Sequence, residues 1–227
     1  MNFRILLAAL SLLASVTTAH GALINWTDWE LRDGMISGSI GGITVKYTGM
    51  YSFVQTGGAT ETNYWTENGT PAPYTGNDVI DNAPTAAEMI ALNVASTHTI
   101  TFSEAILNPV MTIVSMGQPS LAVSYDFDTD FTVLSNGVGY WSYANGGLPG
   151  TYTVDDTNDI LTGNELHAAI QFNGLVSQIT WTSSPNEYWH GFTFGQVTGS
   201  TSVPEPTSLA LLGLGLAGIG FARRRKA

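Results

Sequence analysis

Residues 121–128 read LAVSYDFD, a stretch in which apolar and polar side chains alternate almost one by one. Successive side chains of a β-strand point to opposite faces of a sheet, so this spacing gathers the apolar ones on one face. They are Leu121, Val123, Tyr125 and Phe127. A strand with one apolar and one acidic face is typical of an antiparallel sheet that has a core on one side and water on the other.

Alternating or apolar runs of similar length occur on both sides of this stretch, separated by clusters of turn-forming residues. About ten short strands with turns between them predict an all-β fold, namely an antiparallel β-sandwich with a jelly-roll-like arrangement. The other strands that we expect span 43–47, 99–102, 110–116, 131–134, 138–143, 151–154, 168–172, 178–182 and 192–197.

The segment 85–92 admits two interpretations. Thr85 and Glu88 have the spacing of a capping box before the apolar run 89–92, which favours a helical turn or two. A buried strand fits the same short run equally well.

The charge of the chain is strongly acidic and unevenly distributed. The 227 residues include 7 Lys and Arg against 18 Asp and Glu, and between residues 22 and 202 only Arg32 and Lys46 are basic. Phosphate binding needs a basic surface, so we expect no nucleic-acid partner. The chain has no Cys, which excludes disulfides and a thiol nucleophile, and its length suits one body domain.

The N-terminal residues 1–21 have the order of a secretory signal peptide. Arg4 precedes an apolar stretch at 5–16, and a zone of small residues follows. We expect cleavage after Gly21, with Ala19 as the alternative. A buried N-terminal helix is the competing interpretation, although the run passes directly into polar sequence. A signal peptide predicts that the mature chain works outside the cytoplasm.

The C-terminal residues combine an apolar segment with a basic end. The sixteen residues 207–222 carry no charge and would form a helix about 24 Å long, enough to cross a thin bilayer. The following bases would hold that end in the cytoplasm, because loops on that side of a membrane are enriched in Lys and Arg. They are Arg223, Arg224, Arg225 and Lys226.

Four residues precede this apolar segment, namely Val203, Pro204, Glu205 and Pro206. A proline on each side of Glu205 disfavours helix and keeps the backbone extended at the outer face of the membrane. An extended, solvated backbone is what a protease or transpeptidase needs to enter. The region 198–202 before it is a short linker from the body, residues 22–197.

Residues 203–227 resemble the PEP-CTERM sorting signal of Gram-negative bacteria: a Val-Pro-Glu-Pro motif, an apolar helix and an Arg-rich end. The resemblance implies recognition by exosortase, a membrane-embedded cysteine enzyme that cuts near the motif. It also implies transient anchoring in the inner membrane, then delivery to the cell surface or to the extracellular polysaccharide matrix of a biofilm. A permanent tail anchor is the competing interpretation.

The body is also similar to one that recurs beside such tails and has no characterised function. The stretches that carry this resemblance are TITFSEAILNPVMTIVSMGQPSLAVSYDFD at 99–128 and LTGNELHAAIQFNGLVSQITWTSSPNEYWHGFTFG at 161–195. The similarity extends over residues 86–195. It implies no activity and supplies no catalytic residues.

Two acidic clusters could hold Ca²⁺ through carboxylate oxygens. The first lacks the Gly and Glu of an EF-hand loop and would line the wet face of a strand, and the second lies in a turn, where Asp and Asn are common for backbone reasons. We therefore expect no metal and no cofactor. The clusters are Asp126, Asp128 and Asp130, and Asp155, Asp156, Asn158 and Asp159.

Evidence for catalysis in the sequence is weak. A glycosidase needs two carboxylates on either side of one bond, and Glu104, Glu165 and Glu187 are the candidates. The histidines lack the spacing of a zinc site, so we expect no enzyme. Those of the body are His98, His167 and His190.

The Trp residues offer a different chemistry, because exposed aromatic rings stack on the apolar faces of sugars. Trp181 is in phase with Ile179 and should lie in the core. The pairs Tyr64-Trp65 and Tyr140-Trp141 occur in loop-like sequence and are the better candidates for a binding platform. Core packing is the competing interpretation for both pairs.

These observations predict an exported, non-enzymatic β-sandwich that exosortase processes and delivers outside the cell. A structural or adhesive role within extracellular polysaccharide fits that destination best. The first alternative is a secreted carbohydrate-binding module, and the second is a secreted glycosidase.

Overall fold

The computed structural model describes residues 21–84 and 88–198. The sorting motif, the predicted transmembrane helix, the basic tail and the signal peptide up to its last residue lie outside these ranges. No helix within the described part is long and apolar enough to span a membrane.

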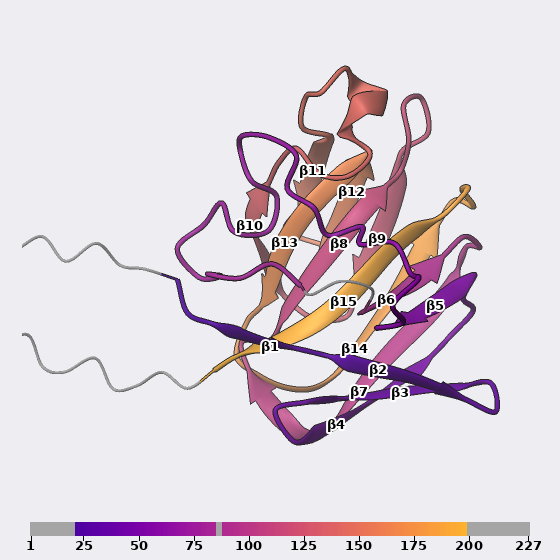
Figure 1. Ribbon diagram of the computed structural model, residues 1–227, viewed down its shortest axis with the longest axis vertical. Helices are drawn as coiled ribbons and strands as arrows, with labels where there is room; N and C mark the ends of the chain where they lie inside the picture. The colour runs from indigo at the N-terminus through magenta and orange to yellow at the C-terminus, as the bar shows by residue number, and fades with distance from the viewer. Residues whose placement is uncertain (1–20, 85–87, 199–227) are drawn as a thin grey trace, which may run out of the picture.

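Fifteen strands form two antiparallel sheets, and the one helical element in the described ranges is a short 3₁₀ turn, η1, at Ser142–Asn145 (Figure 1). The first sheet has seven strands in the order β10-β13-β8-β15-β6-β5, with β1 paired to β15. Their bounds are β1 Ile24–Trp26, β5 Phe53–Thr56, β6 Glu88–Leu92, β8 Val110–Met116, β10 Phe131–Asn136, β13 Leu166–Phe172 and β15 His190–Val197.

The second sheet has eight strands in the order β11-β12-β9-β14-β7-β4-β3-β2. Their bounds are β2 Asp28–Arg32, β3 Met35–Ile40, β4 Ile43–Thr48, β7 Ser96–Leu107, β9 Val123–Phe127, β11 Thr151–Asp155, β12 Ile160–Asn164 and β14 Leu175–Ser184.

The order of eight of these strands is that of a jelly roll. β6, β15, β8 and β13 are neighbours in the first sheet, and β7, β14, β9 and β12 are neighbours in the second. Along the chain, β6 to β9 and β12 to β15 alternate between the two sheets, which gives the paired Greek keys of this topology. The predicted all-β fold is confirmed, and the strand order agrees with a jelly-roll-like sandwich.

The main core lies between the two sheets. Val123, Tyr125 and Phe127 on β9 are buried, while Asp126 and Asp128 are exposed, as the alternation predicts. From β14, Trp181 reaches the same core, where it packs edge-on against Phe192 of β15 with ring centroids 5.1 Å apart. The core position that the sequence predicts for Trp181 is confirmed.

The central strands of the first sheet are buried on both faces. Every residue of β6 and of β8 is buried. On the outer side, two small clusters join this sheet to the segment 57–84: one contains Trp65, Tyr74 and Met89, and the other contains Ile80 and Val110. This segment has little regular structure and acts as a cover on the sheet.

Three sequence expectations need correction or completion. Residues 138–143 are not a strand, because Val138 and Gly139 bond to a loop and the chain then enters η1. In the region 85–92, residues Glu88–Leu92 form the buried strand β6, while 85–87 lie outside the described ranges. The strands β1, β2, β3, β5 and β12 were not predicted.

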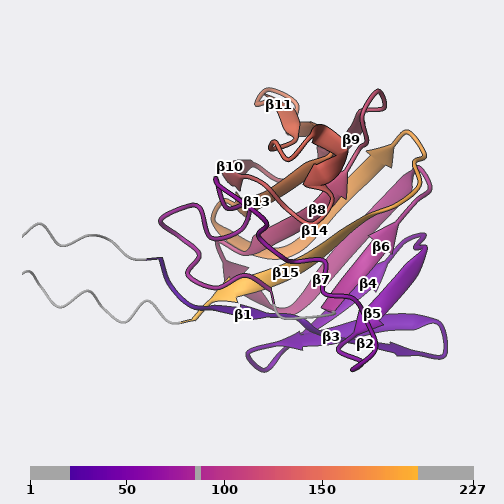
Figure 2. The same cartoon turned by 45° about the horizontal axis from the view of Figure 1, so that its top comes forward.

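Both described ends of the chain leave the sandwich side by side (Figures 1 and 2). β1 pairs with β15, placing Ile24 opposite Val197. The Thr198 N–H donates to the Leu23 carbonyl at 2.8 Å, and the Thr198 hydroxyl donates to the same oxygen. The point of the predicted signal cleavage and the start of the linker therefore lie at the same pole.

Candidate functional site

Six aromatic side chains form a continuous group that we call the aromatic surface. All are partly or largely exposed, and Tyr143 is 67 % exposed. They come from β5, from the segment 57–84, from the region of η1 and from the turn before β15. They are Phe53, Tyr64, Tyr140, Trp141, Tyr143 and Trp189.

Tyr64 is the centre of the aromatic surface. Its ring meets Trp189 edge to face at 4.9 Å between centroids and Tyr140 at 5.0 Å. Trp141 lies nearly parallel to it at 6.4 Å and also contacts Tyr143 at 5.4 Å. Such edge and offset contacts orient each ring through its neighbours, so the rings form a preorganised group.

The prediction that Trp65 belongs to a binding platform is wrong. Its side chain is 2 % exposed and packs edge-on against Tyr74. The indole N–H donates to the Glu88 carbonyl at 3.3 Å. Trp65 therefore anchors the segment on the sheet, whereas its neighbour Tyr64 stays partly exposed.

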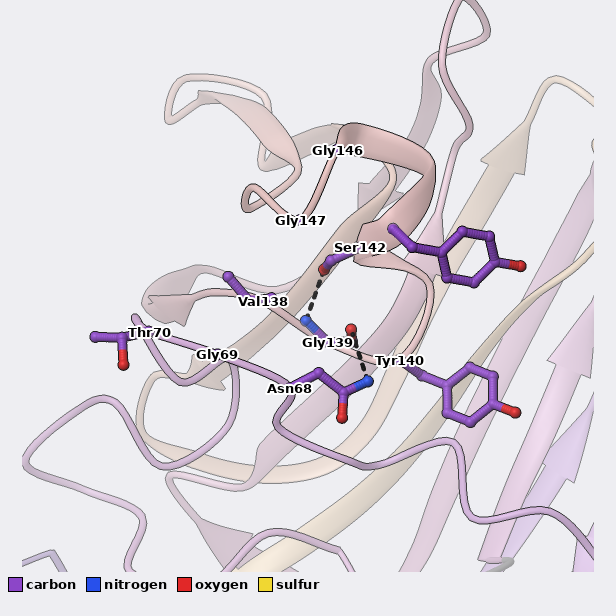
Figure 3. A pocket seen from close by; sticks show the side chains of 10 residues that line it. Asn68, Gly69, Thr70, Val138, Gly139, Tyr140, Ser142, Gly146 and Gly147 are labelled. Carbon is purple, nitrogen blue, oxygen red and sulfur yellow. Dashed lines mark hydrogen bonds between the residues drawn. The ribbon is translucent and has the colours of Figure 1, made fainter.

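A pocket of about 360 Å³ adjoins the aromatic surface (Figure 3). It lies between the loop 68–70 and the segment 138–147, and Tyr140 and Tyr143 belong to both the pocket and the aromatic surface. The Tyr140 ring points away from the group formed by Asn68, Gly139 and Ser142. The pocket is therefore lined by polar groups and adjoins the aromatic surface at Tyr140 and Tyr143.

The two walls of the pocket are fixed to each other by hydrogen bonds. The Asn68 N–H donates to the Val138 carbonyl at 2.8 Å, and the Val138 N–H donates to the Pro71 carbonyl at 2.9 Å. Gly139 donates to the Ser142 hydroxyl at 2.8 Å and accepts from the Asn68 amide at 3.4 Å. A Cβ on Gly139 would lie 2.3 Å from the His167 ring, so only glycine fits this close approach.

None of the predicted glycosidase carboxylates lines the pocket. Glu104 is exposed on β7. The Glu187 carboxylate is buried, bonds His190 Nδ1 and accepts the Gly117 N–H at 3.0 Å. The Glu165 carboxylate is buried elsewhere and accepts the Ser115 hydroxyl at 2.6 Å. The two buried carboxylates are each held by hydrogen bonds from neighbouring protein groups.

The three histidines of the described ranges are buried. His167 Nδ1 is 3.3 Å from the Tyr74 hydroxyl, and burial lowers the pKa of His167 despite the nearby Glu165. His98 lies between the Tyr47 hydroxyl at 2.7 Å and the Ser183 hydroxyl at 2.9 Å. Ser183 resembles a nucleophile beside a base, but it is 1 % exposed and lies in the core.

The charge state of His98 follows from this environment. Burial, and to a smaller degree the nearby His190, lower the pKa of His98 to about 4, so the ring is neutral at pH 7. The Tyr47 hydroxyl also contacts the Met50 carbonyl, to which it donates at 2.6 Å. The Tyr47 hydroxyl therefore accepts a hydrogen bond from the N–H at His98 Nδ1. The other ring nitrogen of His98, Nε2, then accepts from the Ser183 hydroxyl.

The side chains of the two acidic clusters are at least partly exposed, and some accept hydrogen bonds from nearby turn and strand residues. Asp155 accepts the Asn158 amide at 2.7 Å and the Thr157 N–H at 3.0 Å, and these bonds lower its pKa. Asp128 accepts the Thr180 N–H at 2.8 Å, and Asp126, Asp130 and Asp156 are exposed. Burial and Asp130 raise the pKa of Asp159. Within 21–84 and 88–198, no three acidic or His side chains are grouped to hold a metal ion.

Sequence reasoning missed Phe53, Tyr143 and Trp189 as members of the aromatic surface. Tyr188 is 82 % exposed, and the neighbouring Trp189 is half-buried. The stretch 185–190 is thus a third loop with an aromatic pair. That signal could have been read in the sequence. The meeting of this loop with Tyr64 depends on tertiary packing.

Comparison with known proteins identifies the C-terminal region. Residues 202–226 match the family model described as the PEP-CTERM protein-sorting motif. No curated protein and no solved structure shows a significant match. The chain carries this sorting motif, as the sequence predicts. The match supports an exported protein that exosortase processes and that is anchored transiently in the membrane through its C-terminus.

Proposed function

We propose that this chain is a non-enzymatic component of the cell surface or the extracellular polysaccharide matrix, with a structural or adhesive role, delivered there by exosortase processing. The sorting motif at 202–226 is the observation that carries the proposal. Within it, Pro204, Glu205 and Pro206 are the recognition residues, and Arg223 to Lys226 stop transfer across the inner membrane.

The arrangement of the chain ends supports this route. Thr198, at the end of the body, is hydrogen-bonded to Leu23, close to the predicted signal cleavage. One pole of the body thus carries both connections to targeting segments. The rest of the sandwich surface is left available to the surroundings after export.

The state of the candidate catalytic groups supports a non-enzymatic body. Glu165, Glu187 and the three histidines are buried and engaged with neighbouring protein groups. A substrate would have to open the sandwich to reach them. The hydrogen bonds that Glu165 accepts from the Ser115 hydroxyl and Glu187 from the Gly117 N–H give these carboxylates a structural purpose.

Carbohydrate binding is the second candidate function, and the aromatic surface favours it. Rings that remain partly exposed beside a polar pocket are suited to sugar faces. This function is compatible with the first, because an adhesive matrix component binds polysaccharide.

A fractionation experiment in the native host tests the sorting role. We expect the joint change Pro204→Ala, Glu205→Ala and Pro206→Ala to leave full-length protein in the inner membrane. The matched control is Ser200→Ala with Thr201→Ala, two changes in the linker just outside the motif, which should leave export and shortening unchanged. Blotting of membrane and extracellular fractions measures both.

A triple variant that reaches the extracellular fraction at the size and amount of the control would contradict the proposal. So would accumulation of the unaltered protein in the inner membrane at full length. Either result would leave a permanent tail anchor as the better explanation of the C-terminal residues.

A further inference from the structure

The partial exposure of the aromatic surface is the observation that needs a cause. Trp141, Tyr140, Tyr64 and Trp189 are linked ring to ring, yet none is fully buried. Tyr64 and Trp189 pack with one side against the buried cluster of Trp65 and Tyr74, whereas Tyr140 and Trp141 are not part of that cluster and extend the group beyond it. Adjoining aromatic rings left at a surface mark a binding site.

The pocket beside these rings sets the size and polarity of a ligand. Its volume of about 360 Å³ is at the lower end of the range for small-molecule sites. Its lining includes the Asn68 amide and the exposed Thr70 hydroxyl, whereas the Ser142 hydroxyl is buried and accepts the Gly139 N–H. Amide and hydroxyl groups next to aromatic rings match a molecule that presents hydroxyls at its edge and C–H groups on its face.

The pocket rim is shaped by glycine. Gly146 and Gly147 have φ of +68° and +81°, and a Cβ on either would meet nothing within 4 Å. The left-handed backbone accounts for glycine at these positions. Because no atom of the described residues lies within 4 Å of such a Cβ, this side of the pocket is open to solvent. A bulky chain can therefore approach the pocket and the neighbouring Tyr143.

Charge decides which kind of sugar fits. The only basic residues of the body are Arg32 and Lys46, which lie on β2 and β4 of the second sheet. The lining of the pocket has no cation to pair with a carboxylate or a sulfate. An anionic polysaccharide would also be repelled by the acidic body, so a neutral one is favoured.

From these features we infer that the aromatic surface and the adjoining pocket bind a neutral polysaccharide of hexopyranose units. Trp141 and Tyr143 stack on sugar faces, and Asn68 bonds hydroxyls in the pocket. The inference deepens the proposed function, since it gives the adhesive role a site and a ligand class. Figures 1 and 2 show η1, which carries Tyr143, away from the side where the chain ends leave.

Affinity electrophoresis of the processed protein from its native host tests the site. The probe is hydroxyethyl cellulose, a soluble neutral polysaccharide, with alginate as the anionic counterpart. We expect slower migration in the neutral gel alone. Trp141→Ala and Tyr143→Ala should each weaken the retardation constant about tenfold, a loss of ~1.4 kcal/mol.

The matched control is Tyr152→Ala. Tyr152 is also an exposed tyrosine, 41 % accessible, but it lies on β11 outside the aromatic surface and should leave retardation unchanged. Tyr143 is exposed, so its variant keeps the fold and the test stands even if Trp141→Ala unfolds. Near-ultraviolet circular dichroism checks the fold of each variant.

Three results would overturn the inference: no retardation of the folded protein by the neutral polymer, retardation by alginate alone, or equal loss in the Tyr152 control. None of them affects the processing experiment above, which depends on the C-terminal motif. Conversely, normal retardation of a protein that fails to be processed would refute the sorting role and leave the site standing.

Discussion

The outer faces of the two sheets differ in what covers them. On the eight-stranded sheet, strands such as β4 and β9 alternate between buried and exposed residues, and Thr, Ser and Asp side chains meet water. On the seven-stranded sheet, β6 and β8 are buried throughout, because the segment 57–84 lies over them. One sheet faces solvent directly, while the other supports a second layer that carries the candidate site.

Because of this difference, the aromatic side chains have three different roles, depending on the layer in which they lie. Trp181 and Phe192 fill the core between the sheets, where burial of apolar area stabilises the fold. Trp65 and Tyr74 hold the covering segment on the sheet. The aromatic surface forms the outermost level, where rings are fixed by neighbours and remain accessible.

Trp181→Ala should have the largest effect on the free energy of unfolding. Its side chain is 1 % exposed and contacts both sheets, so its removal leaves a large cavity in the shared core. We expect a loss of about 3 to 5 kcal/mol, measured by urea unfolding. A loss below about 1 kcal/mol would show that the two sheets do not share one core.

Trp65→Ala should destabilise the covered sheet more selectively. We expect a loss of about 3 kcal/mol, together with faster amide hydrogen exchange in β6 than in β9. The reason is that Trp65 contacts the outer face of the seven-stranded sheet and donates to the Glu88 carbonyl. Equal acceleration in β6 and β9 would argue against a separable outer layer.

Two buried groups, one in each sheet, should change the free energy of unfolding with pH in opposite directions. On β7, the lowered pKa of His98, about 4, means that the unfolded state binds more protons. The stability contributed by neutral His98 is present above pH 6.5 and is lost as the pH falls toward 4. In the variant His98→Gln, the free energy of unfolding should decline less over this range.

On β6, burial raises the pKa of Glu88 to about 7, although the hydrogen bond from the Trp29 N–H partly opposes the shift. The folded state then holds the extra proton, so this contribution is present below pH 4.5 and is lost as the pH rises to 7. In Glu88→Gln, the free energy of unfolding should therefore decline less between pH 4.5 and 7. Urea titrations at several pH values measure both variants, and a change of the same sign in both would contradict the assignment.

Thr182→Ala on the wet face should have the smallest effect. Its hydroxyl lies 3.3 Å from that of Thr97 across β14 and β7, and both residues are exposed. We expect a change within about 0.5 kcal/mol in urea unfolding, as for most surface substitutions. A loss above 1 kcal/mol would mean that this face is covered in the folded protein.

The two faces also explain what the sequence could and could not predict. Where one face is wet, as along 121–128, the period of two in the sequence identifies the strand and its inward residues. Where both faces are covered, as in β6, the period disappears and helix and strand look alike. The run 110–116 was still recognisable as a strand because it is rich in Val and Ile.

The candidate site was only half predictable for the same reason. Tyr140-Trp141 and Tyr64-Trp65 were visible as aromatic pairs in loops, but the burial of Trp65 depends on a sheet that is distant in sequence. Likewise, the contact between Tyr64 and Trp189 joins residues more than a hundred positions apart, and no local pattern records it. The sorting motif needed no tertiary context, since its signal is contiguous.

Intact-mass spectrometry of the protein recovered outside its native host cell tests the central claim most directly. The account predicts a chain that begins at Ala22, or at His20 if the alternative cleavage is used, and that ends near Pro206. Such a chain has lost both targeting segments at the pole where β1 meets β15. A mass that still includes Arg223 to Ala227 would contradict exosortase processing and establish a permanent tail anchor.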